Sequence, residues 1–191
     1  HEDETVIEIQ DWLHNAYHEA LTLQQIAYAD ANRIYETENK QPLPLDEAAF
    51  REVKGVVDTA VGYSGGTLQN PTYEDVCTHT TGHAEGMRVT YDPAKTNFET
   101  LAKLFFEIHD PTTVDRQGPD IGDQYRSAVF YLNDEQKATT EKLIQQLKDK
   151  GLKVVTQVVP ATKFYPAEDY HQQYYEKKHS KPYCHVYTKR F

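Results

Sequence analysis

The strongest constraint on the fold is the regular change between strand-like and helix-like segments from residue 46 onward. Segments rich in β-branched and aromatic residues predict strands at 55–63, 83–91, 124–132 and 153–159. A helical period of apolar residues predicts helices at 46–54, 97–108 and 134–150, and a Tyr-rich helix is expected near 167–178. This order predicts an α+β fold, a two-layer sandwich in which helices cover a mixed central sheet.

A different pattern occupies the N-terminal part of the chain. Residues 3–38 contain no Gly or Pro, and apolar residues recur at intervals of three or four positions. This rhythm predicts one long amphipathic helix over residues 1–40, through which the chain could form a homo-oligomer. Pro42 and Pro44 then predict an extended linker at 41–45, and a second domain is expected over 46–191.

The charge balance limits the classes of partner. The chain has 20 Lys and Arg against 30 Asp and Glu, a net charge of −10, which argues against nucleic acid as a ligand. No apolar run approaches the ~20 residues of a membrane span, so none is expected. A secreted or periplasmic location is favoured if His1 is the mature terminus, and a cytoplasmic one is expected otherwise.

Four segments of the second domain carry a resemblance to a known family. They read EAAFREVKGVVDTAVGYSGG, NPTYEDVCTHTTGHAEGMRVTYDP, HDPTTVDRQGPDIGDQYRSAVF and FYPAEDYHQQYYEKK. In this order and spacing, they resemble the A-type peptide-methionine sulfoxide reductases from residue 46 to about 185. The resemblance implies a pocket for methionine sulfoxide or a similar small polar ligand, in a peptide or free.

The resemblance also implies roles for four residues. Tyr73 and Tyr125 match two phenols that hold the sulfoxide oxygen, and Glu85 matches the acid that supplies the proton. Asp120 matches a carboxylate that orders the polar network of the pocket. These residue types suit the chemistry, because phenols donate without ionising and a desolvated carboxyl keeps its proton.

One part of the family pattern is missing from this sequence. The family has a GCFWG-type motif before the helix that begins here near Glu47, and counting back places its nucleophilic cysteine at Pro42. The strand that precedes the motif is replaced by polar residues, so an inner strand of the sheet is expected to be absent. We therefore interpret the chain as a pseudoenzyme or a repurposed binding module that keeps the pocket.

Three alternatives remain open at this stage, one of which is that the domain is a structural part of an assembly and that its pocket is vestigial. The chain could reduce methionine S-sulfoxide through Cys184, which resembles a recycling cysteine, or through Cys77, with thioredoxin or another thiol as the reductant. Alternatively, the pocket could host new chemistry assisted by copper or zinc, held by His1 or by His14 and His18, which are one helical turn apart. Otherwise no cofactor is expected.

Overall fold

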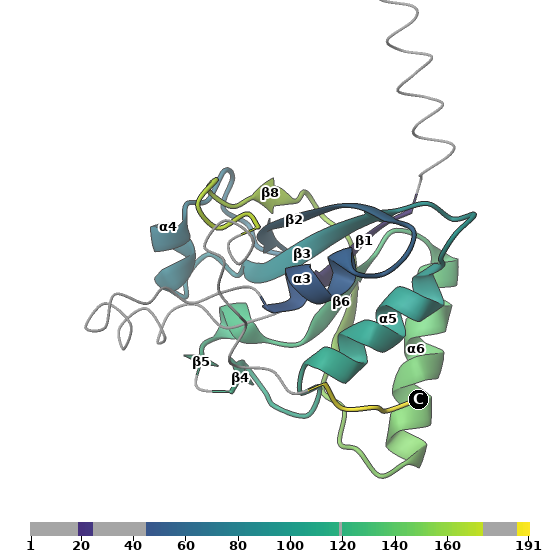
Figure 1. Cartoon of the computed structure of the whole chain (residues 1–191). Helices are drawn as coiled ribbons and strands as arrows, with labels where there is room; N and C mark the ends of the chain where they lie inside the picture. The colour runs from purple at the N-terminus through teal and green to yellow at the C-terminus, as the bar shows by residue number, and fades with distance from the viewer. Residues whose placement is uncertain (1–18, 25–44, 119, 174–186) are drawn as a thin grey trace, which may run out of the picture.

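The computed structural model describes residues 19–24, 45–118, 120–173 and 187–191. Six strands form one mixed sheet in the order β7-β6-β1-β3-β2-β8 (Figure 1). Neighbouring strands are antiparallel except β6 and β7, which are parallel. The strands are β1 Glu19–Gln24, β2 Val56–Ser64, β3 Ala84–Tyr91, β6 Ala128–Tyr131, β7 Gln157–Pro160 and β8 Tyr165–Pro166. A small second sheet pairs β4 Arg116–Gln117 with β5 Asp120–Ile121.

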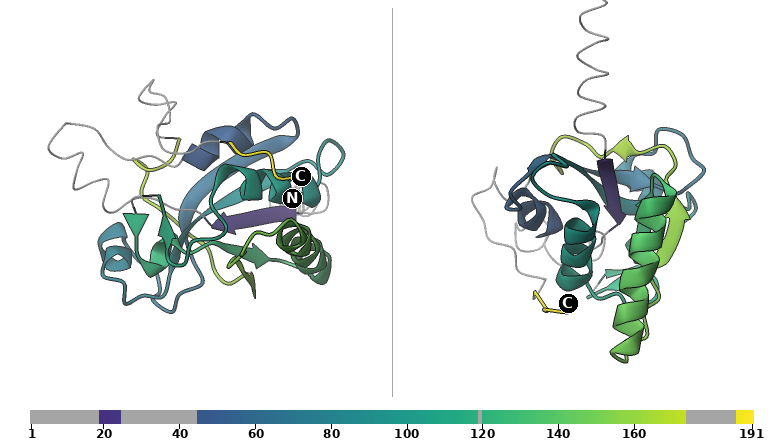
Figure 2. Two further views of the ribbon diagram at one scale, coloured as in Figure 1. Left: turned by 90° about the horizontal axis from the view of Figure 1, so that it is seen from below. Right: turned by 90° about the vertical axis from the view of Figure 1, so that its right-hand side faces the viewer.

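Helices of the described ranges form the second layer of the fold, which Figure 2 shows beside the sheet. They are α3 Leu45–Arg51, α5 Phe98–Ile108 and α6 Asp134–Asp149. Residues from all three share one hydrophobic core with Met87, Val89 and Tyr91 of β3. Because these three β3 residues alternate along the strand, they lie on one face of the sheet. The predicted α+β fold with two layers is therefore confirmed.

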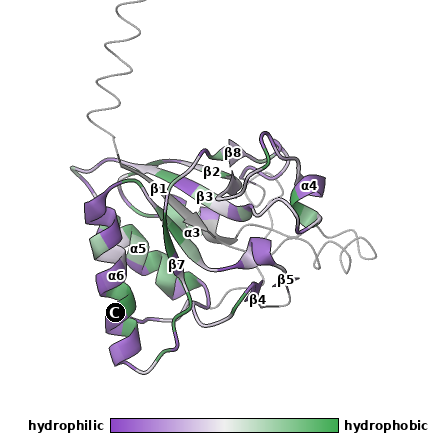
Figure 3. Ribbon diagram, turned by 180° about the vertical axis from the view of Figure 1, so that it is seen from behind, coloured by the Kyte–Doolittle hydropathy of each residue, from purple (hydrophilic) through white to green (hydrophobic). Residues whose placement is uncertain are grey.

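The helix boundaries follow from capping and from apolar periodicity. The side chains of Asn97 and Asn133 accept hydrogen bonds from backbone N–H groups in the first turns of α5 and α6. Hydrophilic and hydrophobic residues alternate along the ribbon of α6 (Figure 3). The buried residues of this helix include Leu143 and Leu147. No helix in the described ranges is long and apolar enough to cross a membrane.

The N-terminal prediction is wrong where the structure describes that region. Residues 19–24 form strand β1, whereas the apolar rhythm predicted that they belong to a helix over 1–40. β1 pairs with both β3 and β6, so it occupies the inner position that the sequence analysis expected to be empty. Pairing with β3 on one side and β6 on the other overrides the local helical pattern of these residues. The remaining parts of the predicted helix lie outside the described residues.

Two further local predictions need correction. The helix expected near 167–178 is not formed up to residue 173, where the chain makes β8 and a series of turns, and residues 174–178 lie outside the described ranges. Within the predicted linker, residue 45 already belongs to α3, while 41–44 are not described. Between β2 and β3 the chain forms a short helix, α4 Tyr73–Cys77, and a 3-10 turn, η1 Asp123–Tyr125, precedes β6.

Candidate functional site

Glu85 is the central residue of the candidate site. It lies in β3 two positions before Met87, so both side chains point to the face of the sheet that carries the main core. Glu85 is 1% exposed, and within the described part of the chain neither of its carboxyl oxygens has a hydrogen-bond partner. Buried polar groups are nearly always paired, so this unpaired acid indicates a place where a ligand group could bind.

A narrow pocket surrounds this carboxyl group. It measures about 180 Å³ and is nowhere wide enough for a water molecule, so a ligand would have to displace one of its walls. Gly62 lets β8 lie close to β2 at the pocket, because it has no side chain. A Cβ atom at position 62 would lie 2.2 Å from the backbone oxygen of Tyr165 in β8. The pocket is lined by Val61, Gly62, Tyr63, Tyr73, Glu85, Ala167 and His171.

The surroundings of Glu85 favour its protonated form. Burial raises the pKa of Glu85 well above its ordinary value, and the nearby carboxylates of Asp120 and Glu168 raise it further. Asp120, in β5, is itself fully buried. Glu85 is therefore a carboxylic acid that carries its proton near neutral pH and can donate a hydrogen bond.

Glu168 joins two walls of the pocket. Its Oε2 accepts a hydrogen bond from the Tyr63 hydroxyl at 3.1 Å, and its Oε1 accepts one from the Tyr73 backbone N–H at 2.9 Å. Burial would raise the pKa of Glu168, but these hydrogen bonds outweigh it and hold the pKa below its ordinary value. Glu168 is therefore ionised while Glu85 keeps its proton, so the two carboxyl groups have different charge states.

The structure gathers the four residues singled out from the sequence. Tyr125, which is fully buried in η1, and Tyr73, which is partly buried, both pack against Val61 of β2. Tyr73 also lines the pocket with Glu85, and Asp120 is close enough to Glu85 to influence its charge. The hydroxyl of Tyr73 hydrogen-bonds the thiol of Cys77 one turn later in α4.

Cys77 lies at the edge of this group and is a poor nucleophile. Burial raises the pKa of its thiol to about 11, because the hydrogen bond from Tyr73 only partly offsets the burial and the neighbouring carboxyl groups of Glu85, Glu74 and Glu168 raise the pKa further. Thiols react as thiolates, so very little of Cys77 is reactive near neutral pH.

We expect alkylation of Cys77 by iodoacetamide to be slow in the folded protein. In a Cys184→Ser variant, only Cys77 can react. At pH 7 its thiolate fraction should be roughly a hundredfold below that of an ordinary thiol, and the rate should rise about tenfold per pH unit up to its pKa. Mass spectrometry of the folded variant and of the same variant in urea measures both rates, and equal rates at pH 7 would refute the raised pKa.

The other thiol and the histidine candidates cannot be placed. Cys184, His1, His14 and His18 lie outside the described residues, as does Pro42. Within the described ranges, no group of three or more His, Cys, Asp or Glu side chains is arranged to hold a metal ion. The proposed metal ligands therefore stay a prediction from the sequence.

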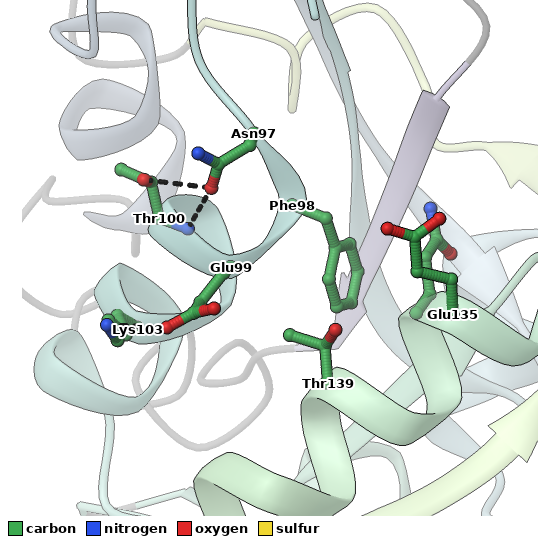
Figure 4. Close-up of a pocket in the computed structure, with 8 residues that line it drawn as sticks. Asn97, Phe98, Glu99, Thr100, Lys103, Glu135 and Thr139 are labelled. Carbon is green, nitrogen blue, oxygen red and sulfur yellow. Dashed lines mark hydrogen bonds and ion pairs between the residues drawn. The ribbon is translucent and has the colours of Figure 1, made fainter.

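A second hollow lies between the first turns of α5 and α6 (Figure 4). It is open to the surface, and its side chains largely satisfy one another: Asn97 caps Thr100, and Lys103 pairs with Glu99 at 2.7 Å. It contains none of the residues that the sequence analysis selected. We therefore place the candidate site at Glu85 and not here.

Sequence reasoning missed Tyr63 and His171, which line the pocket, and Glu168, which joins two of its walls. Tyr63 could have been found, because it precedes the SGG turn at the end of a strand, and it pairs directly with Glu85 across the β2–β3 ladder. Glu168 and Tyr63 are far apart in the sequence, so no local pattern indicated their contact. Burial lowers the pKa of His171 despite the nearby Glu168 carboxylate, so this ring is a neutral wall of the pocket.

Comparisons with known proteins agree on the family of residues 46–191. A family model described as Peptide methionine sulfoxide reductase matches residues 46–191. The Peptide methionine sulfoxide reductase MsrA of Methanosarcina mazei is 58% identical over 135 residues, which cover 69% of this chain and 64% of that protein. The chain therefore spans less than two thirds of the length of this relative.

Solved structures show the same fold. Mxr1 from Saccharomyces cerevisiae in reduced form matches with a TM-score of 0.73 and 31% identity, covering 89% of this chain and 92% of that chain. The same yeast protein in complex with Trx2 matches with a TM-score of 0.53 and 25% identity, covering 89% of each chain.

Proposed function

Because the chain belongs to the peptide methionine sulfoxide reductase family, we propose that its Glu85 pocket binds a methyl sulfoxide side chain, such as oxidised methionine in a peptide, and does not reduce it. The observation that carries this proposal is the buried Glu85 carboxyl in an aromatic pocket, with two oxygens that have no hydrogen-bond partner among the described residues. A sulfoxide oxygen is a strong acceptor, and the protonated carboxyl is a donor in need of one.

The walls of the pocket suit the rest of such a ligand. The rings of Tyr63 and Tyr73 and the apolar Val61 can contact the methyl group and the side-chain carbons. The pocket is too narrow for water in its present form, so a bound sulfoxide would be held in dry surroundings where a hydrogen bond to Glu85 is strong. Ligand binding would require Tyr73, which is only partly buried, or His171 to move outward.

The thiol inventory supports binding over reduction. Reduction of a sulfoxide needs two electrons, and neither carboxylates nor phenols supply them. The chain has two cysteines, and the position that the family motif gives to the nucleophile is Pro42. Cys77 has its pKa raised to about 11 by burial, which leaves it as an unreactive thiol.

The second candidate function is reduction of methionine S-sulfoxide. It is favoured by the names of relatives such as the Methanosarcina mazei reductase. Cys184 would act as the nucleophile, with Cys77 as a weaker candidate, and a protein thiol would return the electrons. The yeast structure in complex with Trx2 indicates the type of protein that could serve as the reductant.

One experiment separates the two functions. The full chain is incubated with dithiothreitol and a peptide that contains methionine S-sulfoxide, and mass spectrometry quantifies the methionine formed. We expect no turnover, but we expect the sulfoxide peptide to raise the melting temperature more than the matching methionine peptide does. In Glu85→Leu, which removes the donor, the affinity for the sulfoxide peptide should fall by about tenfold or more.

Glu141→Gln is the matched control, because Glu141 is exposed on α6, away from the pocket. It should keep the wild-type response to the sulfoxide. Turnover that is lost in Cys184→Ser but kept in Cys77→Ser would establish the reductase and overturn the binding proposal. Absence of both turnover and stabilisation would overturn both functions.

A further inference from the structure

The charges around the pocket are negative or neutral. Three carboxyl groups gather there: Glu85 in the wall, and Asp120 and Glu168 close enough to raise its pKa. No Lys or Arg is among the described residues that line the pocket, and burial keeps the His171 ring neutral. A neutral sulfoxide does not use this negative potential, whereas a cation would.

The walls of the pocket are largely aromatic. The rings of Tyr63, Tyr73 and His171 line it, and the centroids of the Tyr73 and His171 rings are 5.2 Å apart. The Tyr170 ring contacts the His171 ring, with the centroids 4.1 Å apart and the planes tilted by 46°. Aromatic faces attract cations that carry methyl groups, because the ring quadrupole favours positive charge and the methyl groups need little solvation.

Resting on the proposed function of this pocket as a binding site, we propose that it binds a methylsulfonium side chain, with the Glu85 carboxylate as counter-ion and tyrosine rings around the methyl groups. A methylsulfonium and a methyl sulfoxide are both pyramidal at sulfur, and they differ by a methyl group in place of the oxygen. The two ligands therefore have similar size, but they require opposite protonation states of Glu85. The sulfoxide accepts a hydrogen bond from the acid, and the sulfonium pairs with the carboxylate.

This difference makes proton linkage the test. Because Glu85 carries its proton when the pocket is empty of ligand, a bound cation expels that proton, and its affinity should rise with pH. A bound sulfoxide retains the proton, so its affinity should fall as Glu85 ionises. The other titratable groups that face Glu85 or its partners are Asp120, Glu168, Tyr63, Tyr73, Tyr125, His171 and Cys77.

The experiment is isothermal titration calorimetry on the full chain at pH 6 and pH 8. The probes are the N-acetyl amides of S-methylmethionine, of methionine S-sulfoxide and of methionine, which share one side-chain length. We expect the sulfonium to bind more tightly at pH 8, by about tenfold per pH unit over the range in which Glu85 titrates. Uncharged methionine should bind more weakly than the sulfonium at both pH values.

Variants assign the effect to Glu85. Glu85→Gln keeps the shape of the side chain, but Gln cannot ionise. It should lower the affinity for the sulfonium by about tenfold or more and remove the pH dependence of that affinity. Asp120→Asn is a second variant, which lowers the negative potential of the pocket but leaves Glu85, the counter-ion, unchanged. It should lower the affinity for the sulfonium, and this affinity should still depend on pH. Glu141→Gln should behave as wild type, and thermal melting verifies that each variant is folded.

The outcomes separate this inference from the proposed function. If the sulfoxide binds and the sulfonium does not, the sulfonium inference is overturned and the proposed function stands. If the sulfonium binds equally well to Glu85→Gln, the sulfonium inference is also overturned. Sulfonium binding without sulfoxide binding supports the inference and overturns the sulfoxide as ligand. Failure of both probes overturns both proposals.

Discussion

Phe105→Ala is expected to lower the free energy of unfolding by about 3–5 kcal/mol, a large part of the stability of a domain of this size. Phe105 is fully buried in α5 at the centre of the main core. Its ring lies 5.1 Å from that of Phe106 and 3.9 Å from that of His109, centroid to centroid. Removing the ring leaves a cavity between α5 and the sheet that neighbouring side chains can fill only in part.

Guanidinium unfolding followed by circular dichroism measures this loss. Leu68→Ala is the matched control, because it also shortens an apolar side chain but at a position that is 41% exposed. The control should change the unfolding free energy by about 0.5 kcal/mol or less. Equal losses in the two variants would mean that α5 does not carry the core as the structure indicates.

Glu85→Gln is expected to stabilise the protein increasingly as pH rises. Burial and the carboxylates of Asp120 and Glu168 raise the pKa of Glu85 in the folded state above that in the unfolded state. Between these two values the folded protein keeps a proton that the unfolded chain releases, so wild-type stability falls with rising pH. Below the unfolded pKa, Glu85 is protonated in both states and this loss disappears. The Gln side chain cannot titrate, so position 85 contributes no such pH dependence to the free energy of unfolding in Glu85→Gln.

The expected gain of Glu85→Gln over wild type is roughly 1 kcal/mol per pH unit within that window. Denaturant unfolding of both proteins at several pH values gives the difference directly. Glu141→Gln should give a curve parallel to wild type. If the Glu85→Gln curve is also parallel to wild type, Glu85 is not a buried acid with a raised pKa.

Much of the fold from residue 46 onward could be predicted from local patterns. The strand expected at 83–91 is β3 at 84–91, and the helices expected at 97–108 and 134–150 are α5 and α6 within one residue at each end. These elements have clear periods, and both helices have asparagine caps, so their local preferences and their tertiary contacts agree. The positions of Glu85, Tyr73, Tyr125 and Asp120 near one pocket also follow from the quoted motifs, although their roles stay predictions.

The misses came from contacts between distant parts of the chain. β1 has a helical apolar rhythm, and only its pairing with β3 and β6 makes it a strand. The contact of Tyr63 with Glu168 joins segments separated by 105 positions, which no window of local sequence reveals. The segment after β8 makes turns because the side chain of Gln172 bonds the backbone of Val61 in β2, in the place of another strand.

The inner position of β1 has a consequence for biosynthesis. A ribosome releases this strand before either of its neighbours, and β6 is translated only after most of the domain. The nascent chain must therefore hold a strand whose edge toward β6 has no native partner until late in translation, which slows folding and invites pairing with other chains. Early binding by a chaperone would protect the growing chain during that interval.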